Sequence, residues 1–225
     1  MANETTAARG KQDGDKMSDH LLRAAALPTR GQRTALRLLN LFGWQLRYKP
    51  LPGPHGIAVV YPHTSNWDFP LGLLGKWALG LPFRWLAKDS LFRGPMGAIM
   101  RYWGGVAVDR RAPMGATRML AERMLGEKWF WVAITPEGTR GYRPYWKSGF
   151  YHLAAAAKVP LLLISLDYAA KELSLVDVVH LSGDQDADMA AIAALYQGKE
   201  ALYPKNAAPI RLAPPHEGPD RRKSA

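Results

Sequence analysis

Short apolar runs recur along this chain, and stretches with helical periodicity lie between them. The runs contain β-branched and aromatic residues, which is typical of buried strands. The expected strands cover 57–61, 105–108, 129–135 and 160–166, and the expected helices cover 31–49, 116–126, 151–158 and 189–196, with a further helix ending at Trp77. Strands that alternate with helices predict an α/β fold: a single domain with a mostly parallel central sheet flanked by helices.

The limits of the folded domain are expected near the two ends of the sequence. With 225 residues and a hydrophobic content of 48%, the chain suits one well-buried domain. Residues 1–20 are polar and rich in glycine, lysine and aspartate, and residues 206–225 are rich in proline. We expect a basic disordered tail over 1–20, a folded domain over 21–205 and a Pro-rich disordered tail over 206–225.

The composition limits the kinds of site, cellular compartment and partner that we expect for this chain. The absence of cysteine excludes disulfides, thiolate nucleophiles and thiolate metal sites. No apolar run reaches the ~18 residues of a membrane-spanning helix, and the first residues do not form a secretory signal. The net charge of +11 predicts binding to phosphates, on nucleic acid or on anionic lipid. We expect a cytoplasmic protein that lies at the periphery of the membrane.

His63 and Asp68 are the first candidates for chemistry, because they follow the apolar run 57–61, where open α/β sheets place reactive groups. In a helix, residues five apart point about 140° away from each other. The two can therefore meet only if His63 lies on the entry loop and Asp68 in the first helical turn. Asp68 then holds one ring nitrogen and leaves the other as a base. In the alternative, Ser65 and Asp68 merely cap the helix.

Residues 135–140 read TPEGTR and directly follow the apolar run 129–135. Gly138 allows backbone N–H groups to approach an anion, and Thr139 adds a hydroxyl donor. Arg140 can hold a phosphate through two parallel bonds, while Glu137 can pair with an arginine or hold a donor in place. An ordinary surface turn with an internal Glu–Arg pair explains the same residues.

Residues 104–110 read GGVAVDR, a glycine pair that leads into a short expected strand. Arg110 ends this strand and would serve as a second phosphate clamp if it lay near the other two sites. Taken alone, the feature is explained as well by a solvated arginine.

Together, these three blocks resemble the glycerophospholipid acyltransferase family, which includes the lysophosphatidic acid acyltransferases. The matching residues are His63 and Asp68 in PHTSNWD, Arg110 in GGVAVDR, and Glu137, Gly138, Thr139 and Arg140 in TPEGTR. Val159-Pro160 resembles the family's fourth block, although residues 162–164 fill the stretch where the family often carries a second proline. The resemblance extends over about 55–168.

The resemblance implies a glycerol-phosphate acyltransferase-like fold and an O-acyltransferase activity. The acyl chain would pass from acyl-CoA or acyl-carrier protein to a hydroxyl of a lysophospholipid such as 1-acyl-glycerol-3-phosphate. His63 would be the general base and Asp68 its partner, and the matching residues of the other blocks would bind substrate. Without a cysteine or a G-x-S-x-G sequence, direct attack by the hydroxyl is expected rather than an acyl-enzyme.

The expected partners are the lysophospholipid, the acyl donor and an anionic membrane surface, and neither a metal, a cofactor nor a nucleic acid is expected. Two alternatives stay open. In the first, the acceptor is another lysolipid, of the lyso-ornithine lipid or lipid A type. In the second, the chain is a basic membrane-binding or nucleic-acid-binding protein without catalytic activity, for which a change at His63 has no consequence.

Overall fold

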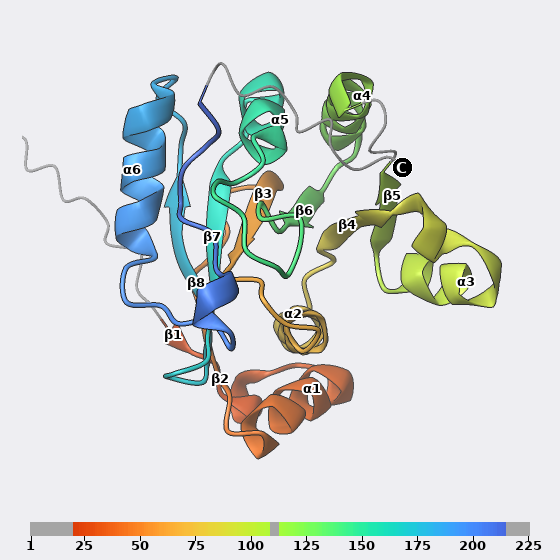
Figure 1. The fold of residues 1–225 in the computed structure, drawn as a ribbon. Helices are drawn as coiled ribbons and strands as arrows, with labels where there is room; N and C mark the ends of the chain where they lie inside the picture. Colours follow the sequence, from red (N-terminus) through yellow and green to blue (C-terminus); the bar gives the residue numbers. More distant parts are fainter. Residues whose placement is uncertain (1–19, 109–112, 215–225) are drawn as a thin grey trace, which may run out of the picture.

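The computed structural model describes residues 20–108 and 113–214, and its centre is an 8-stranded sheet in the order β1-β2-β8-β7-β3-β6-β4-β5 (Figure 1). The strands are β1 (His20–Leu21), β2 (Gln45–Tyr48), β3 (His55–Tyr61), β4 (Arg84–Lys88), β5 (Gly105–Val108), β6 (Phe130–Ile134), β7 (Leu161–Asp167) and β8 (Glu172–Val179). The neighbouring strands β7, β3, β6, β4 and β5 are parallel to one another. β8 runs antiparallel to β7, and β2 pairs with β8 in parallel. The predicted α/β domain with a mostly parallel sheet is confirmed.

Helices lie on both faces of this sheet. They are α1 (Arg30–Leu41), α2 (Asp68–Leu79), α3 (Gly94–Tyr102), α4 (Pro113–Gly126), α5 (Gly149–Ala157) and α6 (Gln185–Leu195), with short 3-10 turns η1 (Ala24–Ala26), η2 (Asp89–Phe92) and η3 (Pro204–Asn206). Figure 1 shows α4, α5 and α6 over one face and α1 and α2 over the other, while α3 lies out at the edge near β5.

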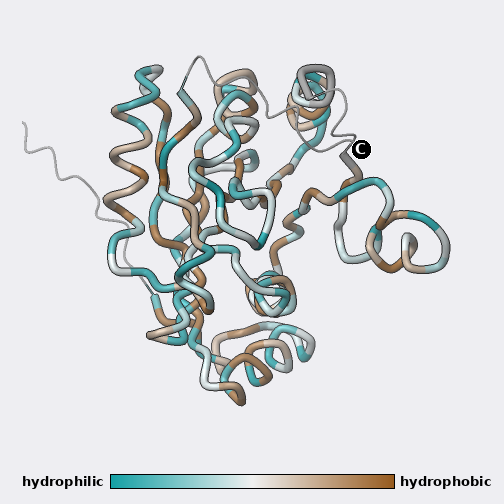
Figure 2. Tube along the Cα trace, in the orientation of Figure 1, coloured by the Kyte–Doolittle hydropathy of each residue, from teal (hydrophilic) through white to brown (hydrophobic). Residues whose placement is uncertain are grey.

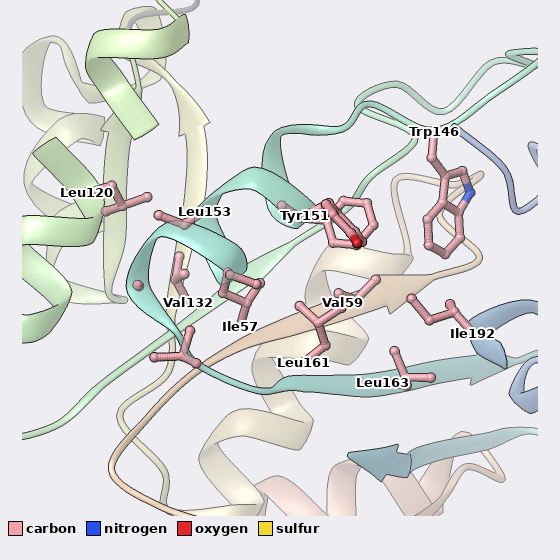
Figure 3. Close-up of a cluster of buried hydrophobic side chains, with 14 of the residues drawn as sticks. Ile57, Val59, Leu120, Val132, Trp146, Tyr151, Leu153, Leu161, Leu163 and Ile192 are labelled. Carbon is pink, nitrogen blue, oxygen red and sulfur yellow. The ribbon is translucent and has the colours of Figure 1, made fainter. Parts of the chain in front are cut away.

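Alternating side chains of the central strands divide the sheet into two surfaces. The packed face, under α4, α5 and α6, carries Ile57, Val59, Phe130, Val132, Leu161 and Leu163. All of these are fully buried, and they interdigitate with Trp146, Leu153 and Ile192 (Figure 3). Burial of one such side chain contributes about 1.5–3 kcal/mol, so this face supplies much of the stability of the domain.

The cavity face, on the side of α1 and α2, is formed by the intervening residues of the same strands. It carries Ala58, Val60, Trp131, Ala133, Leu162, Ile164 and Leu166. Figure 2 shows hydrophobic residues along these central strands, as expected where both sides of a parallel sheet are covered. Small residues such as Ala87 and Ala133 line a cavity on this side of the sheet.

The helix expected over 31–49 is wrong in its second half. α1 ends at Leu41, and Gly43 adopts a φ of 80°, which turns the chain out of the helix. Gln45–Tyr48 then forms β2, which hydrogen-bonds to β8. The short repeat of apolar residues in this segment fits a helix face, whereas the strand forms through pairing with β1 on one side and with the distant strand β8 on the other.

The folded unit also extends past the predicted boundary at residue 205. Residues 206–214 lie against the domain: Ala208 is buried, and Leu212 forms a bridge to Trp146. Of the predicted tail over 1–20, His20 is described and begins β1. The other residues of the two predicted tails, 1–19 and 215–225, lie outside the described part of the chain. Within 20–108 and 113–214, no helix is both long enough and apolar enough to cross a bilayer.

Candidate active site

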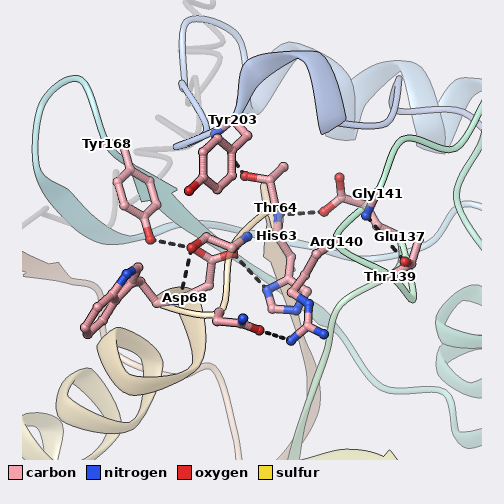
Figure 4. A network of polar contacts seen from close by, with 12 residues as sticks. His63, Thr64, Asp68, Glu137, Thr139, Arg140, Gly141, Tyr168 and Tyr203 are labelled. Atoms are coloured by element: carbon pink, nitrogen blue, oxygen red, sulfur yellow. Dashed lines mark hydrogen bonds and ion pairs between the residues drawn. The ribbon is translucent and has the colours of Figure 1, made fainter.

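The loop that carries His63 begins where β3 ends at Tyr61, and α2 begins at Asp68. Because β3 lies between β6 and β7 and runs parallel to both, the ends of these three strands meet at the same edge of the sheet. The sequence that follows each strand contributes to the site there: the His63 loop after β3, the TPEGTR segment after β6 and Tyr168 after β7 (Figure 4).

His63 and Asp68 lie together in the arrangement that their spacing requires. His63 Nδ1 is 3.0 Å from Asp68 Oδ2, with the histidine on the loop and the aspartate at the first position of α2. The backbone N–H of Ser65 donates to Oδ2 at 2.8 Å, and the Tyr168 hydroxyl donates to Oδ1 at 2.5 Å. Asp68 therefore accepts hydrogen bonds at both oxygens, which fixes the plane of the carboxylate that faces the histidine.

The environment of Asp68 keeps its carboxyl ionised. Burial by itself raises the pKa of Asp68, but the hydrogen bonds from His63, Tyr168 and Ser65 outweigh burial and lower this pKa below its usual value. An ionised Asp68 holds the His63 ring with a proton on Nδ1 and leaves the lone pair on Nε2. The geometry thus suits a base at Nε2, although the catalytic role of the pair stays a prediction.

Glu137 lies next to the pair but makes contacts different from those expected. Its side chain is buried, with 1% exposed, and its two oxygens accept the backbone N–H groups of His63 at 2.6 Å and Ala208 at 3.0 Å. Burial raises the pKa of Glu137 to about 7, although both hydrogen bonds act in the opposite direction. In this structure Glu137 ties the His63 loop to the 206–214 segment. Its contact with substrate stays a prediction.

The structure places only some of the other residues predicted to bind substrate near His63. Gly138 turns the chain with a φ of 65°, and the Thr139 hydroxyl accepts the backbone N–H of Gly141 at 3.3 Å. Arg140 lies near the His63 loop, where its guanidinium donates to the Asn66 side chain. Arg110 lies outside the described residues. Arg140 is therefore the predicted phosphate ligand that the described structure brings to His63.

An apolar cavity of about 420 Å³ opens next to His63 and extends between α2 and the cavity face of the sheet. Strand residues form its floor, α2 covers it, and residues of β4, η2 and α3 form a further wall. The lining includes Gly72, Lys76, Leu91, Met100, Ala133 and Leu166. Lys76 contributes an amine, which donates to the Trp103 carbonyl at 2.5 Å, and burial lowers its pKa.

A polar recess adjoins the mouth of this cavity. Ser65, Asn66 and Arg140 line both spaces, so the cavity and the recess meet at these residues. The remaining lining of the recess is Thr64, Trp67, Gly141, Tyr203 and Asn206. The backbone N–H of Tyr203 donates to the Thr64 hydroxyl at 3.2 Å, which holds the η3 segment beside the His63 loop.

Sequence reasoning missed Tyr168, Tyr203 and Asn206. Tyr168 lies two residues after the end of the expected strand 160–166, and a polar residue near a strand end was the available signal. No comparable signal marks Tyr203 or Asn206, which reach the site from far along the chain. Among the described residues, no group of three histidine, aspartate or glutamate side chains is arranged to hold a metal ion.

Comparisons with known proteins give the family and the fold of the chain. Residues 47–166, which are more than half of the chain, match a family model described as Acyltransferase. A similar solved structure is the 1-acyl-sn-glycerophosphate (LPA) acyltransferase PlsC from Thermotoga maritima, with 18% identity, a TM-score of 0.50, and coverage of 78% of this chain and 83% of that chain. A search of curated proteins finds no match. The protein therefore belongs to the acyltransferase family, and its fold is that of PlsC.

Proposed function

We propose that this protein transfers a fatty acyl chain from a thioester donor, acyl-CoA or acyl-carrier protein, to a hydroxyl of a lysophospholipid such as 1-acyl-glycerol-3-phosphate. One observation carries the proposal: the His63–Asp68 pair lies where an apolar cavity meets a polar recess that contains Arg140. A reaction that joins an acyl chain to a polar lipid headgroup needs these three features at one place.

The apolar cavity suits the acyl chain of the donor. Its lining is predominantly aliphatic and aromatic, and its volume of about 420 Å³ is in the range of sites for small apolar ligands. Each methylene that leaves water for such a site contributes about 0.8 kcal/mol. With the chain inside the cavity, its thioester end would lie near His63 at the mouth.

The polar recess suits the headgroup of the acceptor. The Arg140 guanidinium can bind a phosphate through two parallel charge-assisted hydrogen bonds, and Thr64, Asn66 and Asn206 add polar groups around it. A headgroup fixed there would present its free hydroxyl to His63. Fixing two reactants in this way makes the attack effectively intramolecular.

In the proposed reaction, His63 Nε2 takes the proton of the acceptor hydroxyl as its oxygen attacks the thioester carbonyl. The resulting tetrahedral intermediate collapses with cleavage of the carbon–sulfur bond, and the protonated His63 returns the proton to the departing thiolate. The products are an ester and a free thiol. Asp68 stabilises the positive charge of His63 between the two proton transfers, since its carboxylate is ionised and lies 3.0 Å from Nδ1.

The test is acyl transfer by the purified protein from labelled acyl-CoA or acyl-carrier protein to a panel of lysolipids. The panel includes lysophosphatidic acid, lyso-ornithine lipid and a lipid A precursor. We expect product on lysophosphatidic acid, and we expect His63→Ala to lower the rate of transfer by about 10²–10⁴-fold. His152→Ala, a change to an exposed histidine on α5, is the matched control and should keep its activity.

Two outcomes of this experiment would count against the proposal. A near-normal rate in a folded His63→Ala variant would remove His63 as the base. Transfer only to acceptors without phosphate would assign the site to another lysolipid. Arg140→Ala addresses the second point directly, because it should raise KM for the phosphate-bearing acceptor and leave KM for the donor unchanged, whereas Arg143→Ala should change neither.

A further inference from the structure

The outward face of α3 is apolar, which is unusual for a helix on the surface of a domain. Its sequence, GPMGAIMRY, contains one charged residue, Arg101. Met96 is 55% exposed, Ile99 42% and Tyr102 89%. A surface helix that packs on one side normally turns polar residues to water on the other. In α3 the solvent-facing side chains besides Arg101 include a thioether, an aliphatic chain and an aromatic ring.

Leu91, in the neighbouring turn η2, extends this surface and is 51% exposed. We define the α3 patch as Leu91, Met96, Ile99 and Tyr102. Figure 1 shows α3 at the outer edge of the molecule, where it packs on η2 and β5 and leaves its far side uncovered by the described elements. Contiguous apolar surfaces of this kind mark sites of contact with a partner or a membrane.

Basic residues border the patch. Lys88 and Arg93 are exposed beside η2, and Arg101 lies on α3 itself. Asp89 is the acidic residue of this segment, and its carboxylate is 3.4 Å from the guanidinium of Arg93. The whole chain carries a net charge of +11. An apolar centre with a basic border is complementary to a surface that offers both acyl chains and phosphates.

The inner side of the same segment reaches the apolar cavity. Leu91 and Met100 line its wall, so η2 and α3 separate the cavity from the outside of the molecule. A lipid that entered here from a bilayer would keep its chain in apolar surroundings, whereas a route through water would expose its methylene groups, which is unfavourable. A second apolar surface lies at the end of α1, where Leu41 and the following residue Phe42 are exposed. No residue of α1 lines the cavity.

We propose that the α3 patch docks on the surface of an anionic lipid bilayer and places the cavity wall formed by Leu91 and Met100 against the lipid. This inference rests on the proposed function, because that function makes the bilayer the source of the acceptor. Met96, Ile99 and Tyr102 enter the boundary between headgroups and acyl chains, and Lys88 and Arg93 meet the lipid phosphates. Salt weakens the electrostatic part and leaves the apolar part.

The first experiment is sedimentation of the full chain with vesicles of phosphatidylcholine alone or mixed with phosphatidylglycerol. The wild type should bind the anionic vesicles, less strongly at high salt. The double change Met96→Glu with Ile99→Glu should lower the partition coefficient at least tenfold. The matched control is Met119→Glu with Leu125→Glu, which places the same charges at exposed apolar positions of α4 and should bind as the wild type does.

Three results would overturn the proposal. In the first, the wild type fails to bind anionic vesicles, and in the second, the α3 variant binds them normally. In the third, vesicle binding is lost only in the variant Leu41→Glu with Phe42→Glu, at the end of α1. An activity assay separates this inference from the proposed function. The α3 variant should keep its rate on dispersed short-chain substrates and lose it on lysolipid embedded in vesicles. If no acceptor gives product, the proposed function fails, while the sedimentation result still decides the role of the patch.

Discussion

Leu163 and Leu166 lie on the same strand, β7, and both are buried, yet their surroundings differ. Leu163 belongs to the packed face, where it interdigitates with Ile57 and Val59 beneath the helices. Leu166 points to the other side of the sheet and lines the cavity. One strand therefore contributes both to the main hydrophobic core and to the wall of the site.

This difference separates stability from function within one sheet. The packed face closes its gaps with branched side chains and aromatic rings, and close packing is what makes a core sensitive to single changes. The cavity face is packed less closely, because small residues line the cavity there. They include Ala87 and Ala133 of the sheet and Gly72 of α2, which faces them. At the mouth of the cavity the chain is held by hydrogen bonds to the buried carboxylates of Asp68 and Glu137.

The largest effect is expected from the matched changes Leu163→Ala and Leu166→Ala. The first should lower the free energy of unfolding by about 2–5 kcal/mol, because it opens a new cavity in a packed core. The second should cost less, since Leu166 already lacks partner atoms on its cavity side. Urea unfolding of both variants at one pH measures the two losses. Equal losses would show that the two faces are packed alike.

The strands of this comparison could be predicted because their signals are local. The runs 57–61, 129–135 and 160–166 are each apolar and rich in β-branched or aromatic residues, and they form β3, β6 and β7. Leu173 and Leu175 alternate with polar residues in β8, a readable strand pattern from which no prediction was made. β2 could not be predicted, because it forms by pairing with the two-residue strand β1 and with that same distant strand.

The site divides in the same way. The meeting of His63 and Asp68 follows from a spacing of five residues at the start of a helix. The contact of Tyr168 with Asp68 spans 100 positions in the sequence, and the cavity depends on small residues contributed by separate elements. No single segment of the sequence indicates either the contact or the cavity, so neither could be predicted before the fold was known.

Glu137→Gln tests whether hydrogen bonds rather than packing hold the mouth of the cavity. Glutamine offers one acceptor oxygen in place of two, so the N–H of either His63 or Ala208 loses its partner. An unpaired buried donor costs about 1–3 kcal/mol. We expect this loss in thermal or urea unfolding, together with a fall in kcat, because the loop that carries His63 is no longer fixed.

The pH dependence of stability identifies the same carboxyl. Its pKa rises from 4.5 to about 7 on folding, so the folded state binds the proton more tightly than the unfolded chain. The resulting stabilisation, ~3 kcal/mol, is present below pH 4.5 and is lost as the pH rises to about 7. The difference in unfolding free energy between wild type and Glu137→Gln should fall over this window. Parallel pH profiles would contradict the assignment.

Two tyrosine–aspartate hydrogen bonds, one on each side of the sheet, allow a smaller and more selective test. Tyr168 donates to Asp68 at the mouth of the cavity, and Tyr151 of α5 donates to Asp188 of α6 at 2.8 Å. Tyr168→Phe should raise the pKa of Asp68, because it removes one of the hydrogen bonds that lower it. A hydrogen bond to a charged group contributes about 1.5–3 kcal/mol, so kcat should fall by about tenfold or more.

The pH–rate profile distinguishes the two tyrosines. Without the Tyr168 hydroxyl, the pKa of Asp68 rises, so Asp68 loses its ionised form at a higher pH than in the wild type. The support that its carboxylate gives to the protonated base is lost at the same pH. The acid limb of the kcat/KM profile should therefore move to higher pH in Tyr168→Phe. Tyr151→Phe removes a hydrogen bond to a charged group too, so it should lower stability by about 1.5–3 kcal/mol, but it should leave the profile in place. An acid limb that is unchanged in Tyr168→Phe would limit Tyr168 to a structural role.

The smallest effect in free energy is expected at Gly72 of α2, where the comparison of the two faces predicts the sign. A Cβ added at Gly72 meets no atom within 4 Å and points into the cavity, whereas one added at Gly75 would lie 2.2 Å from the Leu173 side chain. Gly72→Ala should therefore raise the free energy of unfolding by about 1 kcal/mol through helix propensity alone, and Gly75→Ala should lower it. Gly72→Leu would fill part of the cavity, so the optimum of an acyl-CoA chain-length series should move to shorter chains. If the optimum stays in place in a stable Gly72→Leu variant, the acyl chain does not occupy this space, and the hollow side of the sheet serves a different ligand.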